Sequence, residues 1–331
     1  MIRHFLASLF ASALLLPSLS AATITPLHSG WRLQSACKLT ATGDAISAPG
    51  FATQGWISTT VPTTVLAAQV AAGLLPDPYF GDNLRKIPGT SYPIGHNFSN
   101  LPMPADSPYH CGWWYRDDFT VPSAAARSSQ FWLHFAGINY RADIWLNGHR
   151  IADSTQIAGA YRTYNLDVTA FLKPDGHNVL AVETFAPTEN DLGINWVDWN
   201  PAPPDKDMGV IGDVNLVASG AVALRSPMAV THFPSDDLSV ADLTVYAEVE
   251  NAPDHPVHGV VSGSAAGANF EQPVELSAHE QRTVTFTPEQ FPQLRIHNPK
   301  LWWPSQMGDP HLETLTMRSS VECSKVRNSK P

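Results

Sequence analysis

The chain has 331 residues, of which 44% are hydrophobic and only 15% are charged. At roughly 150 residues per domain, this length predicts about two domains, and the composition excludes a disordered or collagen-like chain. The formal net charge is -10. Nucleic acids and anionic membrane surfaces bind basic proteins, so we expect neither as a partner.

The first residues have the pattern of a signal peptide. Arg3 supplies a positive charge, and residues 5–16 (FLASLFASALLL) form an apolar run that Pro17 ends. This run is shorter than the roughly 20 residues of a membrane span, and small residues follow it at a typical cleavage spacing. We therefore predict a signal peptide over residues 1–22 and a secreted or periplasmic protein. A buried N-terminal helix is the alternative.

Export permits disulfides, but the chain has only three cysteines, Cys37, Cys111 and Cys323. Three cysteines do not make a disulfide framework. If one bond forms, Cys37 and Cys111 are the expected pair, because Cys323 lies in a polar, basic tail.

The first predicted element of the mature chain is a helix over residues 65–75 (VLAAQVAAGLL). Thr63 or Thr64 can cap its start, and Gly73 stands where helices end. Residues 76–108 follow, rich in Pro and Gly and almost without periodicity. Long structureless connections are uncommon in compact domains, so we expect this stretch to be functional or tightly packed.

Short strands dominate the sequence after residue 110. Residues 141–146 (RADIWL) alternate and meet Asn147-Gly148, which is a strong hairpin signal because both residues tolerate positive φ. Other strands are predicted over residues 113–119, 131–135, 164–168, 178–185 and 214–218. Short strands separated by turns favour a β-sandwich or jelly roll. Later strands over 243–249, 283–286 and 312–317 favour a second, immunoglobulin-like sandwich, so the predicted fold class is all-β.

Three runs carry a family resemblance: WWYRDDFTVP (113–122), FWLHFAGINYRADIWLNG (131–148) and YNLDVTAFLKPDGHNVLAVE (164–183). They resemble the N-terminal sugar-binding domain of glycoside hydrolase family 2. The resemblance implies a galactose-binding-like jelly-roll β-sandwich over residues 23–222 and an immunoglobulin-like β-sandwich over residues 223–318. In the long enzymes of the family a catalytic (β/α)8 barrel follows, and we predict that this chain lacks it.

Four further motifs indicate the subtype: DPYFGDNL (77–84), PGTSYPIGHNFSNLPMPADSPY (88–109), WNPAPPDKDMG (199–209) and LWWPSQMGDPHL (301–312). They most resemble exo-β-D-glucosaminidases, which remove terminal β-linked glucosamine from chitosan. The expected partner is therefore a carbohydrate. Two alternatives remain: a fragment of a β-mannosidase, which shares the first-domain motifs, and a standalone carbohydrate-binding protein built from the same two domains.

No carboxylate pair in the sequence has the setting of a glycosidase centre. Hydrolysis with retention needs two carboxyl groups about 5–5.5 Å apart, which the family carries on its barrel. The chain has no alternating strand–helix run of the roughly 250 residues that a barrel needs, so we predict no catalytic residue and no activity alone. We interpret the acidic pairs as solvated turns or strand ends: Asp117 with Asp118, Asp205 with Asp207, and Asp236 with Asp237.

Three residues are predicted to contact sugar by resemblance to the family. Residues 197–201 (VDWNP) are similar to a Trp-Asp-Trp-Gly-Pro stretch, which makes Asp198 the best candidate, and Asn83 occupies a similar place in the loop after the helix. Trp199 could offer an aromatic face for stacking. A carboxylate suits a sugar hydroxyl or the glucosamine ammonium. The alternative for Asp198 and Asn83 is bonding to the local backbone, and for Trp199 it is packing in the core.

Other tryptophans raise the same choice between stacking and packing, and for Trp145, on an alternating strand, we expect the core. The rest of this group is Trp113, Trp114, Trp302 and Trp303. The chain departs from the family pattern after Met208-Gly209, where VIG (210–212) replaces Ile-Trp-Arg, and again from residue 319. We predict a divergent tail over residues 319–331.

No cofactor is expected. His255 and His258 have an HxxH spacing, yet they stand among prolines in a predicted turn and have no third ligand, so we expect no metal. The sequence also lacks the glycine-rich nucleotide-binding motifs and the GxSxG motif of serine hydrolases.

Overall fold

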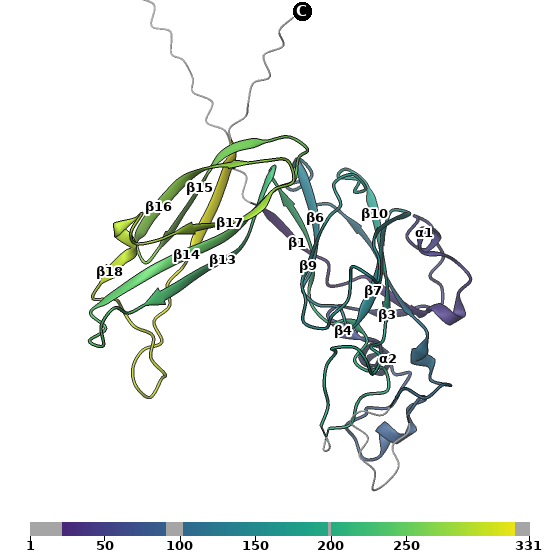
Figure 1. Cartoon of the computed structure of the whole chain (residues 1–331). Helices are drawn as coiled ribbons and strands as arrows, with labels where there is room; N and C mark the ends of the chain where they lie inside the picture. Colours follow the sequence, from purple (N-terminus) through teal and green to yellow (C-terminus); the bar gives the residue numbers. More distant parts are fainter. Residues whose placement is uncertain (1–21, 91–101, 198–199, 322–331) are drawn as a thin grey trace, which may run out of the picture.

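The computed structural model describes residues 22–90, 102–197 and 200–321. These residues form two β-sandwiches, one after the other along the chain (Figure 1). Over the described ranges, no helix has the length and apolar character needed to cross a bilayer.

The first sandwich consists of two antiparallel sheets, of four and six strands. Their orders are β1-β12-β6-β9 and β3-β2-β5-β10-β7-β8, and a small pair joins β4 to β11. The strands are β1 (Thr23–Pro26), β2 (Trp31–Ser35), β3 (Ile57–Thr59), β4 (Thr63–Thr64), β5 (Trp113–Thr120), β6 (Gln130–Phe135), β7 (Arg141–Leu146), β8 (His149–Ala152), β9 (Tyr164–Asp167), β10 (His177–Phe185), β11 (Gly209–Val210) and β12 (Val214–Ser219). The five strands predicted from aromatic and alternating runs and the hairpin over this region are confirmed.

Alternation along the strands builds the core between these sheets. Trp113 and Tyr115 of β5 face inward and meet Leu133 and Phe135 of β6, and all four side chains are buried. At the hairpin between β7 and β8, Asn147 and Gly148 both have positive φ, of 53° and 89°, as the turn requires. The opposite face of the larger sheet has its own apolar cluster.

Trp145 belongs to that second cluster, where it packs against Ile46, Trp56 and Trp114. Ile46 comes from α1 (Gly43–Ile46), a short helix that lies against the outer face of β7. The expectation that Trp145 packs in the protein interior rather than on a sugar is therefore confirmed.

The predicted helix is α2 (Val65–Ala71), and it is shorter than its sequence pattern. Thr64 caps it, because its hydroxyl accepts a hydrogen bond from the Ala67 amide at 3.1 Å. Gly73, with φ of 71°, takes the left-handed conformation just beyond the helix end. The apolar residues Leu74 and Leu75 therefore fall outside the helix.

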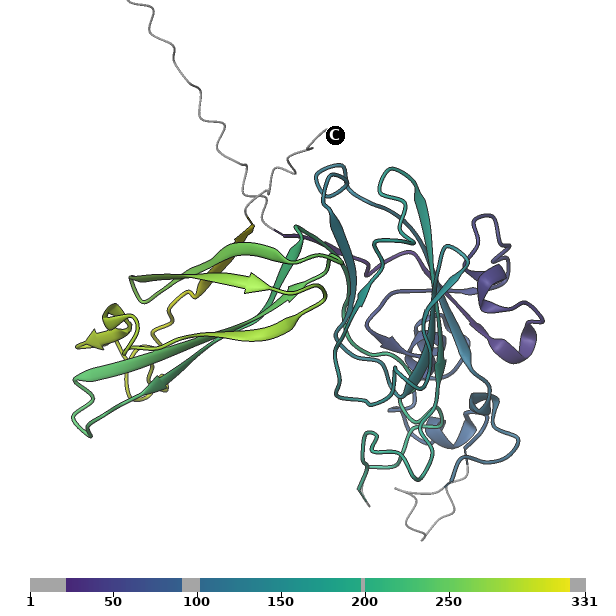
Figure 2. The same cartoon turned by 45° about the horizontal axis from the view of Figure 1, so that its top comes forward.

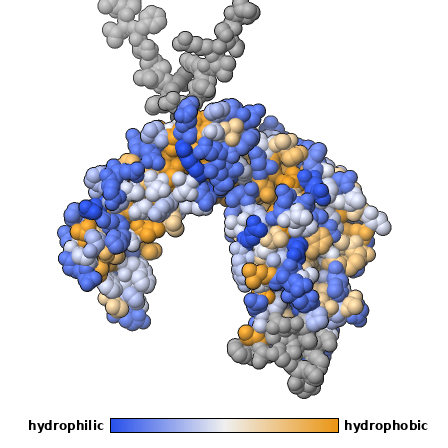
Figure 3. Space-filling model, in the orientation of Figure 1, coloured by the Kyte–Doolittle hydropathy of each residue, from blue (hydrophilic) through white to orange (hydrophobic). Residues whose placement is uncertain are grey.

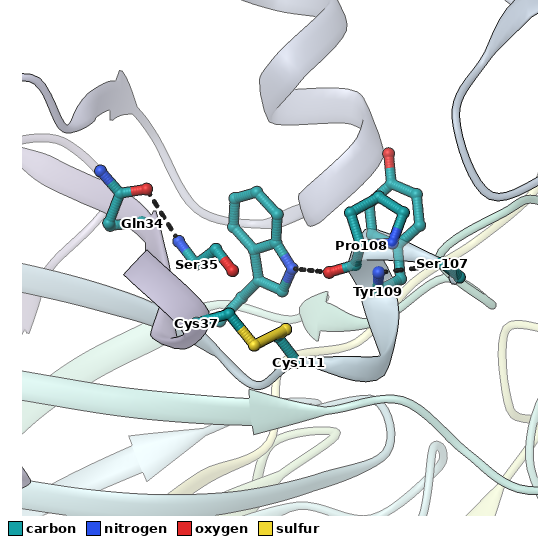
Figure 4. Close-up of a disulfide and its surroundings, with 8 residues drawn as sticks. Gln34, Ser35, Cys37, Ser107, Pro108, Tyr109 and Cys111 are labelled. Carbon is teal, nitrogen blue, oxygen red and sulfur yellow. Dashed lines mark hydrogen bonds between the residues drawn. A yellow bond between two sulfur atoms is a disulfide. The ribbon is translucent and has the colours of Figure 1, made fainter. Parts of the chain in front are cut away.

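Cys37 and Cys111 form the predicted disulfide, with their Cα atoms 5.8 Å apart. The bond joins the 3-10 helix after β2 to the segment that leads into β5, as Figure 4 shows. Beside it, the Ala36 amide donates to the Gly112 carbonyl at 2.8 Å. The disulfide thus fastens the N-terminal strand region to the centre of the six-stranded sheet.

The second sandwich also has two sheets. One runs β13-β14-β17 with β18 paired to β14, and the other runs β16-β15-β19. The strands are β13 (Val222–His232), β14 (Val240–Asn251), β15 (Val257–Ala265), β16 (Ala268–Leu276), β17 (Gln281–Phe286), β18 (Arg295–His297) and β19 (Thr316–Val321). Val245, Phe270 and Phe286 lie in its core, with the two phenylalanine rings 4.7 Å apart.

Two sequence predictions are wrong near the end of the second sandwich. The strand expected over residues 312–317 begins only at Thr316, and Leu312 before it is 80% exposed. The tail expected from residue 319 also begins inside this strand, because Ser319 and Ser320 pair with Val261 and Val260 of β15. An edge strand with a solvated outer face accepts serines, which hid its alternation. Residues 322–331 lie outside the described residues.

The sandwiches meet around Trp132 of β6, which packs against Ala223 and Ala252 of the second sandwich. The Arg225 guanidinium lies 4.2 Å from the centre of the Trp132 ring and also pairs with Glu250. A cation over an indole contributes about 1 kcal/mol or more. Figure 2 shows the second sandwich inclined to the first at this contact.

Candidate functional site

Two loops with predicted sugar-binding residues lie at one end of the first sandwich. One follows α2 and carries Asn83, and the other connects β10 to β11 and carries Asp198; both run below α2 in Figure 1. The pairing of β11 with β4 closes the second loop onto the start of the helix, and the Val65 amide donates to the Met208 carbonyl at 2.8 Å. Both loops are therefore anchored at α2.

Asp205 is the buried link between the second loop and the helix. Its side chain is fully buried; one carboxylate oxygen accepts from the Leu66 amide at 2.7 Å and the other from the Asp207 amide at 3.1 Å. Burial raises the pKa of Asp205 to about 7, although the two amide bonds act in the opposite direction. Because both oxygens are committed to backbone groups, we assign Asp205 a structural role.

Asn139 holds the same loop from the other side. Its side-chain amide donates to the carbonyls of Lys206 and Asp207, each at 2.8 Å, and its own side chain is buried. Lys206 and Asp207 have φ of 55° and 57°, a left-handed conformation that is unfavourable for residues other than glycine. The bonds from Asn139 keep the loop in this strained path.

The start of the loop is fixed by an ion pair. Arg141 of β7 donates to Asp191 through its two terminal guanidinium nitrogens, and the Thr188 amide and hydroxyl donate to the same carboxylate at 2.8 and 2.9 Å. These bonds lower the pKa of Asp191 to about 2. Beside it lies a small cavity of about 130 Å³, whose wall includes Trp196 and Lys206.

Asn83 is half-buried at the start of a 3-10 helix, η2 (Asn83–Lys86). Its side-chain nitrogen donates to the Asp77 carbonyl at 3.0 Å, so this amide bonds the local backbone. That contact fixes the side chain and occupies its nitrogen, while among the described residues none donates to its Oδ1. Asn83 can therefore offer a sugar its side-chain oxygen as an acceptor and its remaining N–H as a donor.

Asp198 and Trp199 lie outside the described residues. Their neighbours Val197 and Asn200 are described and form an antiparallel bridge, with the Asn200 amide 2.8 Å from the Val197 carbonyl. The structure thus shows how the loop is held on both sides of these two residues, and their role stays a prediction.

The remaining aromatic candidates divide clearly. Trp113 and Trp114 are buried, whereas Trp302 and Trp303 are 56% and 37% exposed. The exposed pair belongs to the connection before β19 in the second sandwich. Figure 3 shows hydrophobic residues on the inner flank of this sandwich, near β13, where Met228 and Val230 are exposed.

The interpretation of the acidic pairs as solvated is wrong for two of them. Asp117 is 2% exposed because it lies on the same inner face of β5 as Trp113 and Tyr115. Burial raises its pKa to about 6. Asp205 is buried as described above. Asp236 and Asp237 are exposed in a turn, as predicted. None of the buried carboxylates is open to a substrate.

No three His, Cys, Asp or Glu side chains in the described part of the chain are placed to hold a metal ion. His255 lies 3.2 Å from Asp254, and His258 lies 4.0 Å from Glu275, so each histidine has a separate acidic neighbour.

The support of the site was not visible in the sequence. Asp205 and Leu66 are 139 positions apart, and Asn139 bonds residues 67 and 68 positions away. No local pattern distinguishes these residues from ordinary loop Asp and Asn. Arg141 and Asp191 are 50 positions apart, and no local sequence pattern predicts their ion pair either.

Comparisons with known proteins agree with this architecture. The "Glycosyl hydrolase 2 galactose-binding domain-like" family matches residues 107–195, and "Glycosyl hydrolases family 2" matches residues 222–326. The exo-β-D-glucosaminidase of Streptomyces avermitilis is 38% identical over 304 residues, which cover 91% of this chain and 31% of that protein. The chain thus spans about a third of the length of such relatives.

A solved structure gives the same result. The crystal structure of the Amycolatopsis orientalis exo-chitosanase CsxA matches 90% of this chain and 32% of its own, with a TM-score of 0.77 and 34% identity. The β-mannosidase B of Aspergillus terreus is more distant, at 28% identity over 62% of this chain.

Proposed function

Because the chain belongs to glycoside hydrolase family 2, we propose that it forms the non-catalytic, sugar-binding portion of an enzyme that removes terminal β-linked glucosamine from chitosan oligomers. The observation that carries this proposal is the continuous match of both sandwiches to exo-β-D-glucosaminidases. The matches to mannosidases are less identical, at 26% and 28%, which makes that substrate class the weaker candidate.

In this proposal the end of the first sandwich supplies one wall of the substrate pocket. Asp198 accepts a hydrogen bond from a sugar hydroxyl or from the glucosamine ammonium, Asn83 offers its side-chain oxygen, and Trp199 stacks on the sugar ring. The Asp205 and Asn139 contacts support this role, because a loop fixed before the sugar arrives loses little conformational entropy on binding.

The bond-breaking groups belong to another part of the enzyme in this proposal. Retaining hydrolysis needs two carboxyl groups beside the scissile bond, and the described residues include no (β/α)8 barrel that could carry them. We therefore expect the 331-residue chain alone to hydrolyse neither chitosan oligomers nor aryl β-glycosides. Turnover above the buffer background that survives repurification would contradict this.

We also propose that the protein is exported to the periplasm or the medium. The Cys37–Cys111 disulfide supports this, because such bonds persist mainly in oxidising compartments. N-terminal sequencing of protein recovered from its natural host tests the proposal. A mature chain that begins near residue 23 is expected, and one that retains Met1 would contradict it.

A chimera tests the role of the first sandwich directly. We would replace the two matching domains of the Amycolatopsis exo-chitosanase with residues 22–326 of this chain and measure hydrolysis of an aryl β-glucosaminide. We expect activity, and at least a tenfold loss of kcat/KM in the Asp198→Ala chimera. The Asp236→Ala chimera, altered in an exposed turn of the second sandwich, is the matched control and should stay within twofold. Equal activity of both variants would contradict the assignment of Asp198.

A further inference from the structure

The outer face of the β16-β15-β19 sheet contains a groove of about 620 Å³. Its floor is the central strand β15, where the side chains of Ser262 and Ser264 are too small to fill the space above the sheet. The strands on either side carry longer side chains. The far end of the groove is closed by Phe291 and Gln293, which follow β17.

The strand register places polar groups in two rows across this groove. Ser262 pairs with Glu271 of β16 on one side and with Arg318 of β19 on the other. Ser264 pairs in the same way with Asn269 and Thr316. The rows are two residues apart along each strand, so all six side chains point to the same face of the sheet. The Glu271 carboxylate and the Arg318 guanidinium therefore lie on opposite sides of the groove, with hydroxyl and amide groups beside them.

Arg318 differs from the other arginines of the second sandwich because its side chain has no partner among the described residues. Arg225 pairs with Glu250, Arg295 pairs with Asp242, and Arg282 donates to the Glu275 carbonyl. Over the same described ranges, the side chains of Arg318 and Glu271 make no hydrogen bond or ion pair, and both are solvent-exposed. Their hydrogen-bonding capacity is available to a ligand.

We propose that this groove binds a linear oligosaccharide of β-linked amino sugar, as a site separate from the end of the first sandwich. Glu271 would bind an ammonium group, Arg318 would donate to hydroxyl or ring oxygens, and the serines would bond further hydroxyls. The opposite charges on the two sides of the groove are complementary to an amino sugar, because its ammonium is a cation and its oxygens are hydrogen-bond acceptors. The choice of sugar rests on the proposed function, whereas the groove and its unpaired groups do not.

The groove would hold the polymer about one domain away from the sugar-binding end of the first sandwich. It lies at the end of β15 and β16 where their hairpin turns, and β13 leaves the first sandwich at the opposite end. A second attachment of this kind raises the local concentration of chain ends near the pocket, without a new contact to the terminal sugar.

Titration of the ¹⁵N-labelled full chain with glucosamine hexamer tests the proposal by NMR. We expect the amide signals of Ser262, Ser264, Glu271 and Arg318 to shift together. The dissociation constant obtained from them should rise at least tenfold in Glu271→Gln. Glu275→Gln is the matched control, because Glu275 lies four residues beyond Glu271 on the same face of β16, beside His258. It should leave the dissociation constant within twofold.

Three results would overturn the inference: no shifts on these strands, equal effects of Glu271→Gln and Glu275→Gln, or equal binding of a neutral glucose hexamer that Glu271→Gln does not weaken. The Asp198→Ala variant separates this site from the proposed function. Groove shifts that persist unchanged in Asp198→Ala support an independent site, whereas their loss in Asp198→Ala would overturn it. If the groove fails while the chimera still depends on Asp198, the proposed function stands without it.

Discussion

The candidate sites of the two sandwiches differ in how their polar side chains are used, although each sandwich also has a buried asparagine, Asn139 or Asn251, that bonds loop carbonyls. In the first, the side chains of Asp205, Asn139 and Asp191 point into the domain, and their hydrogen bonds fix loops at one end of it. In the second, Glu271 and Arg318 stay on an open face without partners among the described residues. Buried polar groups that bond the backbone create a rigid frame, whereas exposed side chains without partners leave a surface ready for a ligand.

The largest expected effect concerns the disulfide, which only the first sandwich has within the described ranges. Cys37→Ser with Cys111→Ser frees a loop of 74 residues in the unfolded chain, and we expect the unfolding free energy of the first sandwich to fall by about 4 kcal/mol. Chemical denaturation followed by tryptophan fluorescence measures this. The transition of the second sandwich is the internal control, and an equal fall in both would contradict their independence.

Removal of the buried carboxylate should have the next largest effect. Asp205→Ala leaves the Leu66 and Asp207 amides without an acceptor, and we expect a loss of about 3 kcal/mol in the first sandwich. Asp237→Ala, in an exposed turn of the second sandwich, should cost clearly less. Comparable losses in the two variants would mean that Asp205 does not anchor the loop.

The pH dependence of stability should also distinguish the two sandwiches. Burial raises the pKa values of Asp205 and Glu183 to about 7 and of Asp117 to about 6. In the unfolded chain these carboxyl groups ionise near pH 4, so between pH 5 and pH 8 the folded state binds more protons and stability falls as the pH rises. We expect Asp205 alone to account for a fall of about 2 kcal/mol in the first sandwich.

The second sandwich should lack this decline. Bonding to Arg295 and to Ser235 lowers the pKa values of Asp242 and Asp237, so their contribution is complete at pH 5 and is lost only in stronger acid. Thermal unfolding from pH 5 to pH 8 separates the two transitions. A slope for the first sandwich that is unchanged in Asp205→Asn would contradict the assignment.

The smallest expected effect is self-association through the second sandwich. Trp302, Trp303 and Met307 are exposed there, and exposed apolar surface favours association. We expect concentration-dependent oligomers in sedimentation velocity, and their decrease in the double variant Trp302→Ser, Trp303→Ser. Deletion of residues 322–331 is the control and should change little. A wild-type chain that is monomeric at high concentration would contradict this.

Features that depend on neighbouring residues could be predicted from the sequence. The hairpin at Asn147 and Gly148 follows from the φ preferences of two residues, and the inward position of Trp145 follows from alternation along one strand. The Cys37–Cys111 pair followed from having only three cysteines, one of them in an unusual tail. Each of these needs only a short segment or a small count.

Contacts between distant segments could not be predicted in this way. Asp205 and Asp117 carry the residue type of a solvated turn, and only the assembled sandwich shows that each is enclosed. Strand β19 was misplaced because polar serines replace apolar residues on this edge strand: Ser320 is exposed, whereas Ser319 is half-buried and its hydroxyl donates to the Val222 carbonyl. Asp198 and Trp199 rest on family resemblance alone, because they lie outside the described residues.

The central claim is that the end of the first sandwich forms one wall of a sugar pocket and not a complete site. Titration calorimetry of the 331-residue chain with glucosamine and with chitobiose tests it most directly. A sugar held from one side buries little surface, so we expect millimolar or weaker affinity, about 4 kcal/mol or less, in the wild type. The Asp198→Ala variant should look the same at this level. Micromolar binding that Asp198→Ala abolishes would contradict the account and favour a standalone carbohydrate-binding protein.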